Sequence, residues 1–221
     1  MRIRVLAPPV LLALACWQFG AATYIHAKAL LAQALLERAW VRSLHGERSV
    51  RPWPWADMHP VARLRAPAQG VEWIVLDGAS GQALAFGPAH ILGTALPGQP
   101  GSAALVGHRD THFRFLREIG NGDALEVERL DGERLRYVVT GLRIVDTRLE
   151  RLALDGDGTS LRLITCYPFD AVRPGGPLRF EVIAKAEQNL SPSTTVASRQ
   201  RKLREHRAES GVQSPTNKVM S

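Results

Sequence analysis

Two side chains in this chain of 221 residues carry the chemistry of a thiol-dependent reaction. Cys166 closes the run Leu163-Ile164-Thr165-Cys166, and His108 follows the apolar residues 103–106. A cysteine thiolate is a strong nucleophile, and an imidazole moves protons near neutral pH. Each side chain comes just after an apolar run, where a strand ends and functional groups are often presented. The pattern therefore indicates two reactive groups at two strand ends.

A buried and inert cysteine is the alternative interpretation of Cys166. The second cysteine, Cys16, lies in an apolar N-terminal segment, so no disulfide can form within the domain that holds Cys166. Free cysteine is among the most buried residue types, which favours the inert interpretation. The polar Thr165 before it and Tyr167-Pro168 after it indicate instead a strand that ends at the cysteine.

The spacing of His108 and His112, four residues apart, also occurs in zinc sites on helices. Here Arg109 stands where the helical zinc motif has a glutamate, and Gly107 disfavours a helix. A third ligand would have to be His90 or Cys166, and neither spacing supports that. We therefore predict no metal and no cofactor, and we interpret His112 as a core or loop histidine.

The elements around these residues are predicted to be mainly β. Asp131-Gly132 separates two alternating runs, which is a strong hairpin signal. The predicted strands are Val71–Leu76, Gln82–Phe86, Ala103–Val106, Leu125–Glu128, Leu135–Thr140, Leu142–Val145, Leu161–Thr165 and Leu178–Ala184. Beyond the N-terminal region, helix is expected only over Phe113–Ile119. Seven or eight short strands with tight turns predict a closed barrel or a sandwich.

The N-terminal segment has the length of a membrane anchor. Residues 5–25 contain no Asp, Glu, Lys or Arg, and a helix of that length spans about 30 Å. Residues 1–27 are therefore predicted to be a transmembrane signal anchor. The alternative is a cleaved signal peptide, because Ala13-Leu14-Ala15 fits a cleavage site, and Cys16 after it raises a lipoprotein option.

The distribution of charge argues against a nucleic-acid-binding protein. The formal net charge is +7, but residues 1–45 and 189–221 hold the basic excess, and the middle of the chain is close to neutral. A DNA-binding domain needs its basic residues on the folded surface that meets phosphate. We expect a juxtamembrane helix and a Pro/Trp-rich linker over residues 28–60, a catalytic domain over 61–188, and a basic disordered tail over 189–221.

The order and spacing of four motifs resemble the sortase family of membrane-anchored cysteine transpeptidases. The motifs are Gly93–Gly98, Gly107–Phe113, Leu163–Cys166 and Arg179–Ile183, within roughly residues 60–187. The resemblance implies a closed sortase-type β-barrel of about eight strands with short helices, preceded by the transmembrane helix. Trp53-Pro54-Trp55 and the Tyr-Pro-Phe after the cysteine are most similar to the sortases of Gram-negative bacteria. One departure is Arg162, which stands where the family often has threonine.

The resemblance also implies roles for individual residues. Cys166 is the nucleophile, His108 protonates the leaving amine and deprotonates the incoming one, and Arg179 stabilises the oxyanion. Arg173 competes for the last role, but it lies in a Pro/Gly loop, and a strand positions a side chain better. The residues expected to bind substrate or shape the site are Asp110, Thr165, Leu96, Pro97 and Tyr167.

The implied reaction cleaves a Leu-Pro-x-Thr-Gly-like sorting signal through a thioacyl intermediate and transfers the acyl part to an amine. The expected partners are a secreted protein with a C-terminal sorting signal, an amine acceptor and the inner membrane, with the catalytic domain in the periplasm. Two alternatives stay open: a hydrolytic cysteine peptidase of the same fold, and a membrane-tethered binding or assembly module with an inert cysteine. The His-Gly-Cys run of L,D-transpeptidases is absent.

The thiolate–imidazolium mechanism predicts a slow enzyme with a bell-shaped pH–rate profile. At ordinary pKa values of about 8.5 for cysteine and 6.5 for histidine, only about 1% of molecules hold both charges at pH ~7.5 if the groups titrate independently. The measurement is the transfer rate between pH 6 and 9 under conditions where chemistry limits the rate. A flat profile over that range would contradict this mechanism.

Overall fold

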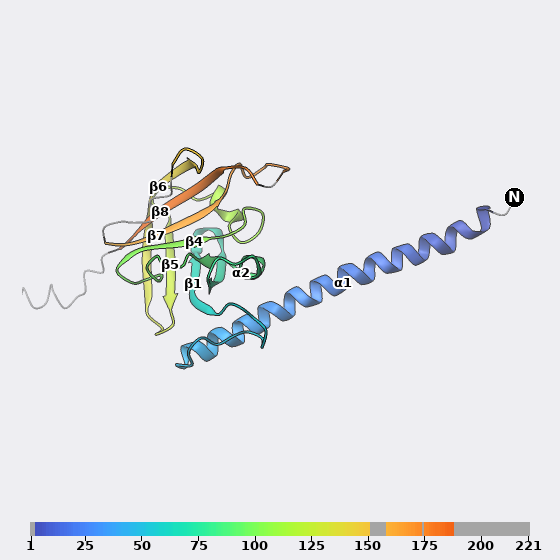
Figure 1. The fold of residues 1–221 in the computed structure, drawn as a ribbon, viewed down its shortest axis with the longest axis horizontal. Helices are drawn as coiled ribbons and strands as arrows, with labels where there is room; N and C mark the ends of the chain where they lie inside the picture. The colour runs from blue at the N-terminus through green and yellow to red at the C-terminus, as the bar shows by residue number, and fades with distance from the viewer. Residues whose placement is uncertain (1–2, 151–157, 174, 188–221) are drawn as a thin grey trace, which may run out of the picture. The chain divides into compact units, whose positions relative to one another are not determined.

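The computed structural model describes residues 3–150, 158–173 and 175–187, and eight of its strands close into a barrel (Figure 1). The strands are β1 (Pro60–Ala66), β2 (Val71–Asp77), β3 (Ala89–His90), β4 (Gly101–Val106), β5 (Ala124–Arg129), β6 (Arg134–Asp146), β7 (Thr159–Cys166) and β8 (Leu178–Ala186). Around the barrel their order is β1-β2-β3-β4-β7-β8-β6-β5. The mainly β closed barrel expected from the sequence is confirmed.

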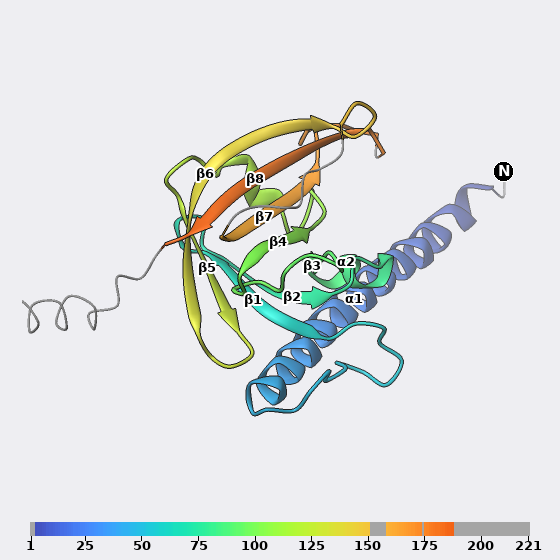
Figure 2. The same ribbon diagram turned by 60° about the vertical axis from the view of Figure 1, so that its left-hand side comes forward.

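Two pairings decide which residues meet at the edge of the barrel. β4 and β7 run parallel, although the facing residues Leu105 and Leu163 are 58 positions apart in the sequence. β7 also pairs antiparallel with β8. Figure 2 shows β6, β8, β7 and β4 side by side in this order. The ends of β4 and β7 therefore lie at the same end of the barrel.

The core of the barrel follows from period-two alternation along the strands. In β1 every second residue is buried, and the strand pattern places Ala62, Leu64 and Ala66 inward while Arg63 and Arg65 face outward. Inward residues of all the longer strands join one apolar cluster. The segment between β4 and β5 adds Phe113, Phe115, Leu116 and Ile119, so it lies against the barrel interior rather than in solvent.

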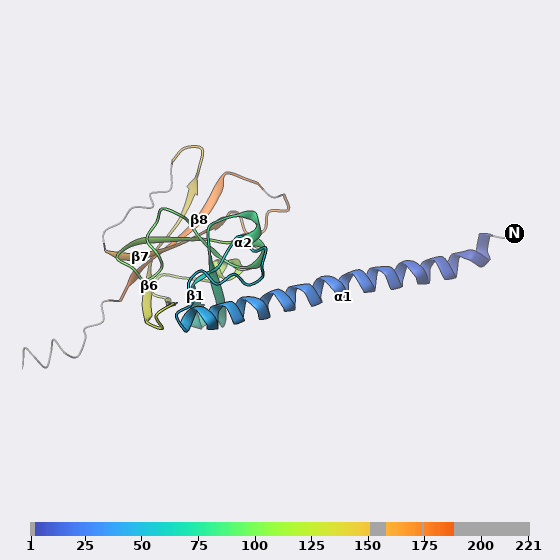
Figure 3. The same ribbon diagram turned by 60° about the horizontal axis from the view of Figure 1, so that its bottom comes forward.

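A long helix, α1 (Ile3–Leu44), packs its C-terminal turns against the barrel. Leu36, Ala39 and Trp40 are each at most 2% exposed. Leu36 belongs to a second apolar cluster with Met58 and Leu76, and Gln33 Nε2 donates to the carbonyl of Phe86. Figure 3 shows this end of α1 beside β1. The juxtamembrane helix expected within residues 28–60 is thus packed against the barrel through Leu36.

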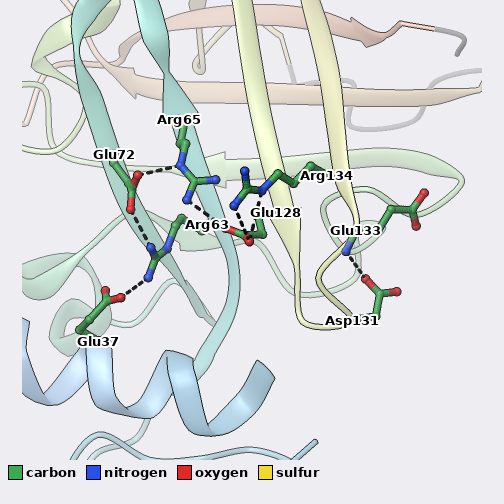
Figure 4. A network of polar contacts seen from close by, with 8 residues as sticks. All are labelled: Glu37, Arg63, Arg65, Glu72, Glu128, Asp131, Glu133 and Arg134. Carbon is green, nitrogen blue, oxygen red and sulfur yellow. Dashed lines mark hydrogen bonds and ion pairs between the residues drawn. The ribbon is translucent and has the colours of Figure 1, made fainter. Parts of the chain in front are cut away.

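Alternating charges tie α1 to the outer face of β1, β2, β5 and β6 (Figure 4). Arg63 binds Glu37 of α1 and Glu72 of β2, and its guanidinium lies 5.2 Å from the Trp40 ring centroid. Arg65 binds Glu72 and Glu128, at 2.7 and 3.0 Å. Because these outward arginines share carboxylates across three strands and a helix, they form a network rather than isolated surface pairs.

One predicted strand is wrong. Gln82–Phe86 forms most of a short helix, α2 (Gly81–Phe86), because the side chain of Ser80 caps its N-terminus by accepting the Ala83 N–H at 3.0 Å. Two short 3₁₀ turns, Pro67–Gln69 and Arg114–Arg117, complete the helical elements of the part of the chain that the structure describes. The second replaces the helix expected over Phe113–Ile119.

The structure contains two strands that the sequence did not predict, β1 and β3, and it joins two predicted strands into one. β1 was missed because alanine at its inward positions weakens the apolar signal, and β3 is only two residues long. The predicted strands Leu135–Thr140 and Leu142–Val145 form the continuous β6, whose register against β8 shifts between Val139 and Gly141. Such an irregularity breaks the sequence alternation without ending the strand.

The two ends of the chain bear on the anchor and tail predictions. No helix in the described residues includes a stretch both long and apolar enough to cross a membrane. The side chains of residues 1–16 lie outside what the structure describes, as does the whole of the expected tail, 189–221. Within the linker, Trp53 packs edge-on against Phe86 at 4.9 Å, whereas Trp55 is 77% exposed.

The packing of α1 predicts that its buried leucine stabilises the barrel. Leu36→Ala should lower the free energy of unfolding by about 2–5 kcal/mol, because it leaves a cavity in a cluster shared with β2. Leu30→Ala is the matched control, since Leu30 is 74% exposed and should change stability by less than about 0.5 kcal/mol. Urea unfolding of both variants measures this, and equal effects would contradict the docked helix.

Candidate functional site

The parallel pairing of β4 and β7 brings His108 and Cys166 to neighbouring positions. Val106 pairs with Ile164, and the N–H of Gly107 donates to the carbonyl of Ile164 at 3.3 Å. Two residues beyond this rung are His108 on one segment and Cys166 on the other. Backbones of paired strands are about 4.8 Å apart, so His108 and Cys166 are attached to backbone segments that lie next to each other.

A side-chain hydrogen bond fixes this junction. Thr165 is 2% exposed, and its hydroxyl donates to the carbonyl of Gly107 at 2.7 Å. Thr165, which precedes Cys166, is therefore hydrogen-bonded to Gly107, which precedes His108. Thr165 was predicted to shape the site, and its position fits that role.

The chain turns sharply after Gly107. The carbonyl of His108 accepts the N–H groups of Thr111 and Phe113, at 3.4 and 3.0 Å. The Phe113 ring lies so close to Gly107 that a Cβ there would come within 2.8 Å of it. A glycine is required at this position for steric reasons, and the buried ring beneath it supports the turn that presents His108.

Arg179 lies directly across from Cys166. The two residues form a rung of the antiparallel β7–β8 ladder, and residues opposite one another in such a ladder share a face. Arg179 donates from Nη1 to the carbonyls of Gly176 and Leu178, at 2.7 and 2.9 Å. Arg173 lies in the exposed loop between the strands. The register thus favours Arg179 over Arg173 as the cation beside the thiol.

The three predicted catalytic side chains are all reachable from solvent. Cys166 is a free, partly exposed cysteine, Arg179 is partly exposed and His108 is exposed. This arrangement contradicts the interpretation of Cys166 as a buried, inert thiol. A nucleophile, an acid–base group and a cation on one accessible face can act on an acyl substrate.

Arg162, which departs from the family pattern, forms an ion pair with Glu181. Arg162 donates to Glu181 at 2.7 Å and to the Ser102 hydroxyl at 3.1 Å. Glu181 is fully buried and also binds Arg143 across the β6–β8 ladder. The arginine therefore satisfies a buried carboxylate on β8, two residues from Arg179. A buried charge of this kind is costly unless it is paired.

The other predicted site residues divide by position. Tyr167 stacks on Phe180 beside the cysteine, with the ring centroids 6.2 Å apart. Asp110 is exposed, with its carboxylate 3.5 Å from the Arg109 guanidinium. Leu96 and Pro97 lie in the turn before Gly101, at the start of β4, whereas His108 follows its end. A six-residue strand is about 17–20 Å long, so the structure does not bring these two residues to the thiol.

His112 lies in the turn but points into the protein. It is 7% exposed, and its ring meets the Trp73 ring edge-on at 4.8 Å. Burial, with a smaller contribution from the charge of His108, lowers the pKa of His112 to about 4. Within the described ranges no three His, Cys, Asp or Glu side chains are grouped to hold a metal. Its position fits the core histidine that the sequence suggested.

Sequence reasoning assigned no role to Arg109 or Glu181, two charged residues that the structure buries beside the site. Arg109 stands inside the Gly107–Phe113 motif, and its position next to His108 was the available signal. Glu181 falls on the outward period of β8, where a carboxylate is ordinarily solvated. Only the cross-strand register reveals its two arginine partners.

The burial of His112 predicts a pH-dependent loss of stability. The unfolded chain takes up a proton near pH 6.5, whereas the folded chain resists it down to about pH 4. Stability is therefore full above pH 6.5 and falls as the pH drops toward 4, by up to about 3 kcal/mol. Urea unfolding at pH 7 and pH 4 should show a smaller drop for His112→Gln than for the wild type. Identical drops would contradict a neutral, buried His112.

Comparison with known proteins agrees with this geometry. Residues 64–187 match the model of the sortase domain family. Sortase D of Bacillus subtilis is 32% identical over 123 residues, which are 55% of this chain and 61% of that relative. The chain thus spans less than two thirds of the length of this curated relative.

Solved structures share the fold at lower identity. Sortase A of Corynebacterium diphtheriae has a TM-score of 0.51 and 23% identity, covering 73% of this chain and 87% of the other. Sortase C of Clostridium perfringens, in a structure with the C-terminal cell wall sorting motif, has a TM-score of 0.52 and 18% identity, covering 73% and 90%. With the family match over more than half of its length, this chain belongs to the sortase family of cysteine transpeptidases.

Proposed function

We propose that this chain is a membrane-anchored transpeptidase that cleaves a Leu-Pro-x-Thr-Gly-like sorting signal and joins the acyl part to an amine. The observation that carries the proposal is the placement of three groups at one end of neighbouring strands: Cys166 ends β7, Arg179 lies opposite it on β8, and His108 follows the parallel β4. No part of this arrangement requires a cofactor.

The first half of the reaction forms a thioester. The thiolate of Cys166 attacks the carbonyl carbon of the threonine in the sorting signal. The tetrahedral intermediate collapses, the carbon–nitrogen bond to glycine breaks, and the imidazolium of His108 gives its proton to the leaving amine. The developing oxyanion is stabilised by the guanidinium of Arg179, which has five donors and uses only Nη1 for its two backbone carbonyls.

The second half reverses the proton transfer. An incoming amine attacks the thioester carbonyl, and His108, now neutral, takes the proton from that amine. The carbon–sulfur bond breaks, so a new amide forms and the Cys166 thiolate is restored. Because a thiolate is both nucleophile and leaving group here, cysteine suits a reaction that exchanges one amide for another.

The substrate class is supported by resemblance. The Clostridium perfringens sortase C structure contains a C-terminal cell wall sorting motif. We extend that class of substrate to this chain, with a secreted protein as the donor and an unidentified amine as the acceptor. Trp53-Pro54-Trp55 and Tyr167-Pro168-Phe169 support a place among the sortases of Gram-negative bacteria.

The proposed location is the inner membrane, with one N-terminal span and the catalytic domain in the periplasm. The uncharged residues 5–25 support the span, because 21 residues of helix match the hydrocarbon thickness of about 30 Å. The single helix α1 would then lead directly from the bilayer to the barrel that its last turns contact.

The proposed function predicts a thioacyl adduct on Cys166. The chain from residue 28 onward, which keeps the packed turns of α1, is mixed with a library of Leu-Pro-x-Thr-Gly-like peptides and analysed by intact-mass spectrometry. We expect a mass gain equal to the N-terminal peptide fragment, and no gain in Cys166→Ala. Added amines that discharge the adduct into new amides would separate transpeptidation from hydrolysis.

Arginine variants test the oxyanion role. Arg179→Ala should slow adduct formation by about 10²–10³-fold, whereas Arg173→Ala, on the exposed loop, should change the rate only a few-fold. No adduct with any peptide, together with a Cys166 that resists iodoacetamide, would overturn the proposal in favour of a binding module.

A further inference from the structure

Arg109 holds the loop that follows the cysteine. Its Nη1 donates to the carbonyl of Pro168, and its Nη2 donates to the carbonyls of Ala171 and Arg173, at 2.8, 2.8 and 3.4 Å. The side chain is buried, with 7% of the residue exposed. The residue next to His108 thus reaches across to the segment that starts just after Cys166.

The loop has little backbone structure of its own. Residues 167–177 join β7 to β8, and among those described, one weak bond from Ala171 N to the carbonyl of Pro168, at 3.4 Å, closes a turn. Backbone carbonyls away from water need donors. Near β8 the donors are Arg179, which binds the carbonyl of Gly176, and Thr147, which binds the carbonyl of Pro177. Between Pro168 and Arg173 the donor from outside the loop is the guanidinium of Arg109.

The burial of Arg109 is costly for stability, which argues for a specific role. Its nearest carboxylate, Asp110, is 3.5 Å away on a side chain that is 73% exposed, so the cation depends mainly on carbonyl dipoles. An apolar side chain of similar length would fill the same space without the cost of desolvating a charge. What the arginine adds is three fixed contacts to one loop, in the fork geometry that only a guanidinium provides.

We infer that Arg109 is a positioning residue that fixes residues 168–173 of the loop after β7, and through them the presentation of Cys166. The path is short: Arg109 binds the carbonyls of Pro168, Ala171 and Arg173, and only Tyr167 separates Pro168 from Cys166. The same residue is joined by a peptide bond to His108, so one side chain links both halves of the site. The inference rests on the proposed function for its catalytic consequence.

Loop mobility tests the structural half of the inference. A nitroxide is attached at Val172→Cys, which is 98% exposed, in the full chain with Cys16 and Cys166 replaced by alanine. The label should be markedly more mobile in Arg109→Gln than in the parent, and of intermediate mobility in Arg109→Lys, which retains one donor group.

Arg114→Gln is the control, because Arg114 is an exposed arginine on the same segment. In this variant the label should have the same mobility as in the parent.

Single-turnover kinetics test the catalytic half in proteins that retain Cys166. The rate constant for thioacyl formation does not depend on the fraction of active enzyme, so partial misfolding cannot imitate the effect. Arg109→Gln should lower it by about tenfold to a hundredfold, the cost expected when a catalytic group moves by about 1 Å. Arg109→Lys should recover part of the rate, and Arg114→Gln should keep the parent rate.

Each outcome decides the inference. A folded Arg109→Gln with unchanged label mobility and rate would overturn it. If that variant does not fold, Arg109→Lys decides in its place, and a lysine variant identical to the parent in mobility and rate would also overturn it. The label needs no substrate. A parent protein that forms no thioacyl adduct would contradict the proposed function, while the mobility of the label would still decide whether Arg109 holds the loop.

Discussion

The site depends on the parallel pairing of β4 with β7. These strands come from distant parts of the chain, and their pairing places the residues that follow Val106 and Ile164 side by side. Without it, His108 would have no fixed relation to Cys166. The Thr165 hydroxyl on the Gly107 carbonyl locks the same junction, and the antiparallel partner β8 then adds Arg179 on the next strand. The barrel thus converts three separate motifs into one reactive face.

Two buried charged residues, Glu181 and Arg109, lie next to the reactive face. Glu181, on the strand that carries Arg179, binds Arg162 on the cysteine strand β7 and Arg143 on β6. Arg109 is buried against loop carbonyls. Desolvated charges rarely add net stability but become strongly destabilising when one partner is lost. Such groups restrict the backbone to one arrangement, which suits a site whose three members come from three separate segments.

The sequence allowed the barrel, most strands and the three reactive residues to be predicted, because alternation and motif order are local signals. The helix over Gly81–Phe86 was missed although Gln82, Ala83 and Leu84 are good helix formers and Ser80 caps the helix, because a short segment after a turn was interpreted as a strand. The partners of Glu181 depend on strand register, with Arg162 19 positions away, and the loop contact of Arg109 with Ala171 joins residues 62 positions apart. No local sequence pattern contains either. Leu96 and Pro97 precede β4 and lie at the other end of this strand from His108, so their role toward a substrate stays a prediction.

The central claim is that His108 and Cys166 act as a pair. It is tested most directly by the rate of Cys166 alkylation by iodoacetamide as a function of pH, in the wild type and in His108→Gln, each with Cys16 replaced by alanine. A paired imidazolium stabilises the thiolate, so the account predicts that removal of His108 slows alkylation near neutral pH and shifts its rise to more alkaline pH. Superimposable profiles in the two proteins would show that the histidine does not act on the thiol, and would contradict the account.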